Sequence, residues 1–133
     1  MQTKNMLNGE CLCGKVSWEM HGPYEFFGMC QCSRCRKVTG AAFATNLFVK
    51  PEQFSWLSGQ NKRGEYILSP PDTFGNAFCN NCGSRVPRQP AGGWMLAPLG
   101  STMELPDIEP TLVCPEDHTD WFTNLEEILK KGK

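Results

Sequence analysis

Histidine, net charge and long hydrophobic runs are all scarce in this chain of 133 residues. Its 13 lysines and arginines nearly balance 14 aspartates and glutamates, and the net charge of −1 lacks the basic excess of a nucleic-acid-binding protein. No apolar run approaches the roughly 18 residues that indicate a membrane span. The two histidines, His21 and His118, are expected to be ordinary surface residues. We therefore expect neither a nucleic acid nor a membrane as partner.

A secretory leader is also missing from the first residues, which contain neither an apolar core nor a small-residue cleavage site. The expectation is a cytoplasmic protein. Disulfides are rare in the reducing cytoplasm, where clustered thiols usually hold metal, so the eight cysteines are interpreted as metal ligands. The alternative is a disulfide framework in a protein exported by a route that the sequence does not reveal.

The 13 glycines and 10 prolines divide the chain into short segments and disfavour long helices. A hydrophobic content of 40% can still support a core, and the length suits one zinc-binding domain over residues 1–133. Apolar alternation and turn residues predict short strands over Val16–Met20, Tyr24–Met29, Ala41–Lys50, Phe54–Leu57, Gly64–Leu68, Gly92–Ala97 and Thr111–Cys114.

Two short helical segments complete this mainly β prediction. Ser33 can cap a helical turn just after the central cysteines, and Thr39-Gly40 would end that turn. The segment Asp120–Lys131 predicts a short C-terminal helix. Small Ala42 and Ala44 share one face of their strand, where another group is expected to approach closely.

Seven of the eight cysteines fall into three groups. These groups are Cys11-x-Cys13-Gly14, Cys30-x-Cys32-x-x-Cys35 and Cys79-x-x-Cys82-Gly83. The spacing in the last group is that of a zinc knuckle, in which both thiolates bind one tetrahedral ion. A closed structural site needs four such ligands, so this knuckle requires a second pair.

The second pair is either Cys11 with Cys13 or two members of the central group, and we favour Cys11 with Cys13. Residues two apart in a strand point to the same face, so these sulfurs can share an ion at the entry to the first strand. A structural zinc site can contribute on the order of 10–16 kcal/mol, which is comparable with the whole stability of an ordinary domain.

Cys30, Cys32 and Cys35 then remain, one ligand short of a closed tetrahedron. Catalytic zinc sites share this feature, because water or substrate takes the fourth position. A thiolate-rich site is soft and should favour a sulfur ligand from a small thiol. The central group is therefore the candidate catalytic site.

Arg34, Arg36 and Lys37 surround the central group. Their positive charge is expected to lower the thiol pKa values and to attract a carboxylate-bearing thiol, which makes them candidate substrate-binding residues. Two alternatives remain open for the central group. Either Cys114 completes a second structural site, or the cysteines form a metal-free redox site.

Outside the three groups the candidates are weaker. Arg85 and Arg88 follow the Cys79–Cys82 knuckle and are expected on the solvated surface, with anion binding as a secondary role. Cys114 would be the reactive thiol if the protein were a thiol-dependent reductase.

Three motifs together resemble the glutathione-dependent formaldehyde-activating enzyme family, which includes the centromere-protein-V group. They are Gly9-x-Cys11-x-Cys13-Gly14-x-Val16, Cys30-x-Cys32-Ser33-x-Cys35-Arg36-Lys37-x-Thr39-Gly40 and Phe78-Cys79-x-x-Cys82-Gly83-Ser84. The resemblance runs from about Gly9 to Trp121. It implies a mainly β fold of the β-tent kind, built from short antiparallel strands.

The resemblance also implies two zinc ions per chain. A structural ion would be held by Cys11, Cys13, Cys79 and Cys82, and a catalytic ion by Cys30, Cys32 and Cys35. The implied activity is that of a carbon–sulfur lyase, in which glutathione and the small aldehyde formaldehyde form S-(hydroxymethyl)glutathione or are released from it. The alternative is a non-catalytic zinc-stabilised binding module with two structural sites.

Two positions depart from the family pattern. Gln31 stands where the family commonly has a histidine between the first two central cysteines. Thr111 follows Pro110 where the family often has another histidine. If either imidazole orients a ligand or moves a proton in the family, this chain lacks that group.

Overall fold

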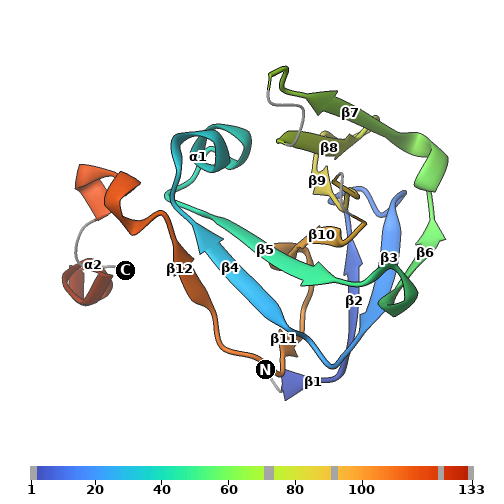
Figure 1. Cartoon of the computed structure of the whole chain (residues 1–133), viewed down its shortest axis with the longest axis horizontal. Helices are drawn as coiled ribbons and strands as arrows, with labels where there is room; N and C mark the ends of the chain where they lie inside the picture. Colours follow the sequence, from blue (N-terminus) through green and yellow to red (C-terminus); the bar gives the residue numbers. More distant parts are fainter. Residues whose placement is uncertain (1–2, 71–73, 91–92, 123–124, 132–133) are drawn as a thin grey trace.

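The computed structural model describes residues 3–70, 74–90, 93–122 and 125–131, and these residues form a mainly β molecule (Figure 1). Two α-helices accompany the strands in those ranges: α1 (Ser33–Thr39) follows the central cysteines, and α2 (Leu125–Lys131) lies near the C-terminus. The predicted fold class is therefore confirmed. The predicted C-terminal helix began at Asp120, but a 3-10 helix occupies Asp120–Phe122, and residues 123–124 lie outside the described part.

The strands within the described ranges form four small sheets. The largest has the order β10-β5-β4-β12, with β10 at Met95–Pro98, β5 at Ala44–Val49, β4 at Phe26–Cys30 and β12 at Thr111–Val113. A second sheet contains β2 (Met6–Glu10), β3 (Ser17–His21) and β6 (Phe54–Ser58). A third contains β7 (Arg63–Ile67), β8 (Gly75–Cys79) and β9 (Arg85–Val86). A two-stranded sheet pairs β1 (Thr3–Lys4) with β11 (Leu105–Pro106).

Short 3-10 helices connect several of these strands. Their bounds are Pro51–Gln53, Gln60–Lys62, Leu99–Ser101, Pro115–Asp117 and Asp120–Phe122. The one at Gln60–Lys62 carries the chain from β6 in the second sheet to β7 in the third. Most strand pairs are antiparallel, as predicted, but β12 lies parallel to β4 and β1 lies parallel to β11.

The core lies between the sheets, where alternate residues of the strands turn inward. β3 shows the two-residue burial period expected of a half-buried strand, with Trp18 and Met20 fully buried. Leu47 and Val49 of β5 are also fully buried in this core. Trp18 meets Trp56 edge to face, with 6.4 Å between ring centroids, which links β3 to β6.

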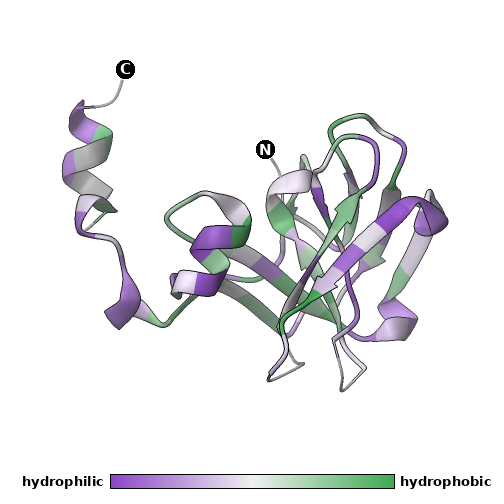
Figure 2. Ribbon diagram, turned by 90° about the horizontal axis from the view of Figure 1, so that it is seen from above, coloured by the Kyte–Doolittle hydropathy of each residue, from purple (hydrophilic) through white to green (hydrophobic). Residues whose placement is uncertain are grey.

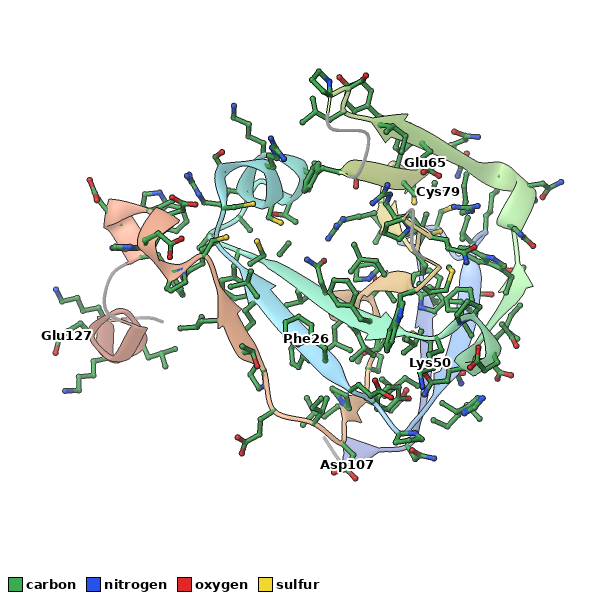
Figure 3. The ribbon with its side chains drawn as sticks, viewed as in Figure 1. Phe26, Lys50, Glu65, Cys79, Asp107 and Glu127 are labelled. Carbon is green, nitrogen blue, oxygen red and sulfur yellow. The ribbon has the colours of Figure 1, made fainter. Side chains whose placement is uncertain are left out.

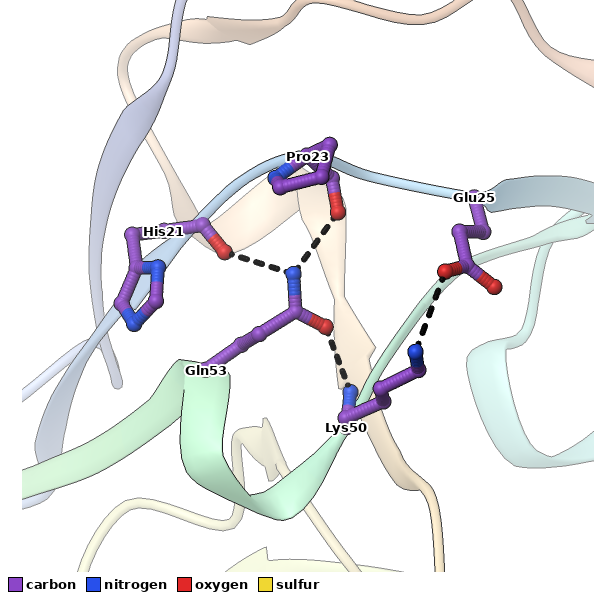
Figure 4. A network of polar contacts seen from close by, with 5 residues as sticks. All are labelled: His21, Pro23, Glu25, Lys50 and Gln53. Carbon is purple, nitrogen blue, oxygen red and sulfur yellow. Dashed lines mark hydrogen bonds and ion pairs between the residues drawn. The ribbon is translucent and has the colours of Figure 1, made fainter.

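A buried glutamine joins three segments at the far end of β5. The Gln53 side-chain amide donates hydrogen bonds to the carbonyls of His21 and Pro23, and its oxygen accepts one from the Lys50 N–H (Figure 4). The Lys50 ammonium in turn lies 3.4 Å from the Glu25 carboxylate. This network satisfies backbone groups that sheet pairing leaves open where β3 passes into β4.

β4 and β5 run through the middle of the molecule, and α1 lies where β4 ends (Figure 1). Helix α2 lies at one edge, apart from the sheets (Figure 2). No helix in the described ranges is long and apolar enough to cross a membrane.

Candidate metal centres

The first cysteine cluster brings together Cys11, Cys13, Cys79 and Cys82, with all four sulfurs within 4.8 Å of one another. The Cys11 and Cys13 sulfurs are 3.6 Å apart, and those of Cys13 and Cys79 are 3.8 Å apart. Four thiolates around one zinc ion at bonds of about 2.3 Å would be about 3.8 Å apart in a tetrahedron. The donor set and its spacing therefore fit a structural zinc ion.

Two similar turns present these sulfurs. In one, the Gly14 N–H donates to the Cys11 carbonyl at 3.0 Å, and in the other the Gly83 N–H donates to the Cys79 carbonyl at 2.9 Å. Gly14 and Gly83 both have φ of +79°, a left-handed conformation in which glycine carries little cost. Both pairs are therefore held in knuckle-like turns.

Cys11 and Cys13 precede the strand β3, as predicted, but the strand geometry expected to bring their sulfurs together is wrong. They lie in the turn between β2 and β3, and β2 itself was not predicted. Residues two apart in a strand are separated by about 6.6 Å, which is too far for two sulfurs pointing straight out to share one ion. The turn brings the sulfurs closer than a strand could.

Backbone and side-chain donors surround the first cluster and favour thiolates. The N–H of Val16 donates to the Cys11 sulfur at 3.3 Å, and that of Asn81 to the Cys79 sulfur at 3.4 Å. Hydrogen bonds from the Ser84 side chain and backbone lower the pKa of Cys82 to about 5. The Asn81 side chain likewise lowers the pKa of Cys13, whereas burial raises that of Cys11.

The second cluster contains Cys30, Cys32 and Cys35, whose sulfurs also lie within 4.8 Å of one another. Cys30 is the last residue of β4, and Cys35 lies in the first turn of α1. The N-cap of α1 is Cys32 rather than the predicted Ser33, because the Cys32 sulfur accepts the Cys35 N–H at 3.4 Å. Gly40, with φ of 63°, ends the helix as predicted.

The surroundings of the second cluster shift the pKa values of its thiols in opposite directions. Burial is the main reason why the pKa of Cys35 is raised. Burial opposes ionisation of Cys32 as well, but the Cys35 N–H and the neighbouring thiols outweigh it, so the pKa of Cys32 is lowered. Ala44 packs against Cys30 and Cys35, which confirms that a small residue of β5 meets a close neighbour. Three soft sulfur donors at this spacing fit a zinc ion with a fourth position left for another ligand.

Cys114 lies beside the second cluster without joining it. It packs against Cys30 and Cys35, yet its sulfur is outside the group whose members all lie within 4.8 Å. Cys114 follows directly after β12, which ends at Val113. Its φ of 53° is positive, which is uncommon for a residue other than glycine. Burial, followed by the charges of Cys30 and Cys32, raises the pKa of Cys114.

A pocket of about 340 Å³ opens onto the second cluster. Phe26 of β4, labelled in Figure 3, lines this pocket, and Phe48, Phe74 and Leu96 add further apolar wall. The other lining residues are Gly28, Cys30, Cys32, Cys35, Asn46, Gly75, Arg85, Arg88, Pro90 and Val113. The central cysteines thus share a largely apolar pocket with two arginines.

The expectation that Arg85 and Arg88 lie on the solvated surface is wrong. Arg88 is only 4% exposed, and both residues line the pocket. Arg85 donates to the Asn46 side-chain oxygen at 3.0 Å and to that of Asn76 at 3.2 Å. Burial lowers the pKa of Arg85, although negative charge on the nearby Cys35 sulfur works against that shift. The short strand β9 carries Arg85 inward, and no periodic signal in two residues could have revealed it.

The three predicted substrate-binding cations are absent from the residues that line this pocket. Arg34 and Lys37 line a neighbouring pocket with Tyr66 and Phe74. The Arg36 side chain donates to the Gln31 carbonyl at 3.1 Å. A role for these cations in substrate binding stays a prediction.

The two positions that depart from the family pattern also lie away from the pocket lining. Gln31 is buried and lines a separate cavity of about 400 Å³ together with His118. Thr111 pairs with Gly28 across β12 and β4 and is exposed. Neither residue is among those that line the pocket beside the second cluster.

The fold and these sites define a small β protein with two cysteine clusters suited to metal. The chain belongs to the glutathione-dependent formaldehyde-activating enzyme family, whose family model matches residues 6–118. A crystal structure of a Rhodobacter sphaeroides protein superimposes with a TM-score of 0.56 at 20% identity, covering 77% of this chain and 97% of that chain. This likeness supports the fold alone. No curated protein matches the chain.

Proposed function

We propose that this protein is a zinc-dependent enzyme that makes or breaks a carbon–sulfur bond between a small thiol, such as glutathione, and a small aldehyde, such as formaldehyde. The observation that supports it is the position of the second cluster, where three cysteine sulfurs within 4.8 Å line a pocket of about 340 Å³. Family membership supports the glutathione and formaldehyde part of the proposal.

The proposal divides the metal between two roles within a single domain, residues 1–133. The first cluster holds a structural ion, because four sulfurs from two turns complete a tetrahedron. The second cluster, with Cys30, Cys32 and Cys35 as ligands, holds a catalytic ion. A cytoplasmic setting belongs to the same proposal, since reducing compartments keep clustered thiols available for metal.

The reaction needs a thiolate and a carbonyl carbon held together. Zinc at the second cluster would supply a positive centre that favours the ionised form of a substrate thiol. The sulfur lone pair forms a bond to the aldehyde carbon, the carbon–oxygen π pair moves to oxygen, and that oxygen takes one proton from water, which balances the proton that the thiol released to water on ionising. Cleavage runs the same steps in reverse.

The residues of the pocket contribute orientation and charge. Phe26, Phe48 and Leu96 form an apolar wall, which lowers the local dielectric and limits competing water. Arg85 is fixed by Asn46 and Asn76, and its positive charge offsets the negative thiolate cluster. These residues hold the reactants without forming covalent bonds to them.

Titration of cobalt-substituted protein with glutathione tests the proposal, because cobalt absorption reports the ligands around the metal. We expect the spectrum of the second cluster to change at millimolar thiol. Exchange between free and thiol-bound formaldehyde, measured by magnetisation-transfer NMR, should be faster than in buffer. An unchanged cobalt spectrum together with an unaccelerated exchange rate would refute the proposed activity.

The alternative is a binding module with two structural metal sites. The observation that supports it is the position of Cys114, which packs against the cluster that contains Cys30. In that case Cys114 moves by a small amount to close the second site. Cys114→Ser should then weaken metal binding at the second cluster. Under the proposed function, the same substitution leaves the metal content and the response to glutathione unchanged.

A further inference from the structure

We propose that Arg88 receives a carboxylate of the substrate, so that the pocket selects acidic thiols over neutral thiols of the same size. The inference rests on the proposed function and adds to it the group that recognises the substrate's charge. It replaces the helix cations Arg34, Arg36 and Lys37 as the expected anion receptor.

The guanidinium of Arg88 is buried without adequate partners. The residue is 4% exposed, and its Nε is a buried atom with no hydrogen-bond partner in the described structure. Its nearest carboxylate, that of Glu65, lies 3.7 Å from Nε, which exceeds a good charged hydrogen bond. A buried donor without a partner carries a cost that an arriving acceptor would remove.

Arg88 is also fixed in place. Its backbone N–H donates to the Leu96 carbonyl at 3.1 Å and its carbonyl accepts from the Leu96 N–H at 2.8 Å. Gly75 leaves room for the side chain, since a Cβ there would lie 3.0 Å from Arg88 Nη2. The backbone of Arg88 is thus held in place and its side chain is buried, so the residue has little freedom to lose when it binds a planar carboxylate.

Arg85 is the less suitable receptor. Its Nε and Nη1 already donate to the side-chain oxygens of Asn76 and Asn46. The Cys35 and Cys30 thiolates act on its charge as well, which ties it to the cysteine cluster. Arg85 thus serves the cluster, and Arg88 remains for the ligand.

The apolar wall around Arg88 and the exposed position of Glu65 both favour binding of a substrate carboxylate at Arg88. Phe26, Phe48 and Leu96 line the same pocket, and an apolar wall strengthens a charged hydrogen bond. The Glu65 side chain is 38% exposed and comes from β7 (Figure 3), so this carboxylate competes for Arg88 but can turn toward water when another anion arrives. A substrate carboxylate would take over from Glu65.

The test compares 3-mercaptopropionate with its methyl ester, binding to zinc-loaded protein by calorimetry. We expect the acid to bind about 10- to 100-fold more tightly, the factor typical of a hydrogen bond to a charged group. Arg88→Met should reduce this preference to about onefold and leave the affinity for the ester unchanged. Glu65→Gln should tighten binding of the acid several-fold, because it removes the competing carboxylate. Lys62→Gln, which removes an exposed charge at a residue outside the pocket lining, is the control and should change nothing.

Several outcomes would overturn the inference. They are equal affinity for acid and ester in the natural protein, a preference that survives Arg88→Met, and a preference that disappears in Arg34→Gln instead. If Arg88→Met does not fold by circular dichroism, Arg88→Lys and Glu65→Gln decide. If Arg88→Lys does not reduce the preference for the acid and Glu65→Gln does not tighten binding of the acid, the proposed role of Arg88 is wrong.

A carboxylate without sulfur separates this inference from the proposed function. Isobutyrate should bind weakly and lose that binding in Arg88→Met. Isobutyrate binding that depends on Arg88, with no cobalt response to either thiol, would sustain the inference and refute the thiol chemistry. A cobalt response to both thiols at equal affinity would sustain the chemistry and refute the role of Arg88.

Discussion

Single cysteines should separate the two clusters by their effect on folding. Cys82→Ala removes one of four sulfurs that join distant segments, so we expect loss of zinc and a fall of roughly 5 kcal/mol or more in the free energy of unfolding. Cys32→Ala removes a helix cap, which should cost about 1 kcal/mol, and it should abolish the cobalt response to glutathione. Urea titrations with metal analysis measure both effects.

Equal effects of Cys32→Ala and Cys82→Ala on folding would contradict this division between the clusters. If Cys32→Ala unfolds the protein as thoroughly as Cys82→Ala, the second cluster is structural and the binding-module alternative gains. Cys114→Ala is the matched control, because Cys114 lies beside the second cluster but outside both sulfur groups.

The first cluster should bind zinc with a pH dependence set in part by Ser84. Because the pKa of Cys82 is lowered to about 5, its thiolate is present above that pH and is lost as the pH falls through it. Zinc affinity should already decrease as the pH falls through neutrality, because the pKa of Cys11 is raised and protons compete with zinc for that thiol, and protonation of Cys82 should steepen the fall at about pH 5. Ser84→Ala removes the side-chain hydrogen bond and should raise the pKa of Cys82, so the steep fall in zinc affinity should move to higher pH. Competition with a coloured chelator across a pH series gives the profile, and superimposable profiles would exclude this role of Ser84.

At the residue scale, spacing could predict which thiols meet, whereas it could not predict which arginines are buried. Cysteine pairs with two-residue spacing carry a geometric requirement that can be recognised in any chain. An arginine carries no such requirement, and its usual place is the surface. Arg88 is buried because of contacts with neighbouring strands, above all with Leu96 of β10 and Gly75 of β8, and the spacing of the knuckle cysteines does not predict these contacts.

At the scale of elements, two glycines in left-handed conformations should respond differently to substitution. Gly83 has φ of +79° and Gly59 has φ of +75°. A Cβ on Gly83 would meet nothing within 4 Å, so Gly83→Ala should cost only about 1–2 kcal/mol of conformational strain. A Cβ on Gly59 would overlap the Lys15 carbonyl, so Gly59→Ala should cost clearly more. Urea unfolding of the zinc-loaded variants measures both, and equal costs would contradict the steric argument.

The strands show how far periodicity reaches. Those with clear alternation, such as β3 and β5, lie close to their predicted positions. The pairs β1–β11 and β8–β9 involve strands as short as two residues, where no period can be recognised. The parallel pairing of β12 with β4 joins residues far apart in sequence, and it depends on the whole sheet rather than on either strand.

At the scale of the molecule, the two clusters fasten different parts of the structure. The first joins the β2–β3 turn to the β8–β9 turn, and Cys13 and Cys79 are separated by 66 positions in the sequence. The second lies within one local segment, from the end of β4 into α1. Long-range closure removes more freedom from the unfolded chain than local closure does, so the first cluster should carry more of the stability.

Stepwise removal of metal should reveal this division. A chelator should strip the second cluster first, because only three sulfurs would hold an ion there and the pocket admits solvent beside it. The β-sheet circular dichroism should persist through this first loss and collapse only with the second. Metal analysis and circular dichroism on the same samples follow both steps. Simultaneous loss of both ions with the fold would mean that the open cluster also supports the structure, whereas a fold that survives complete removal would mean that packing of the Trp18 core alone is sufficient.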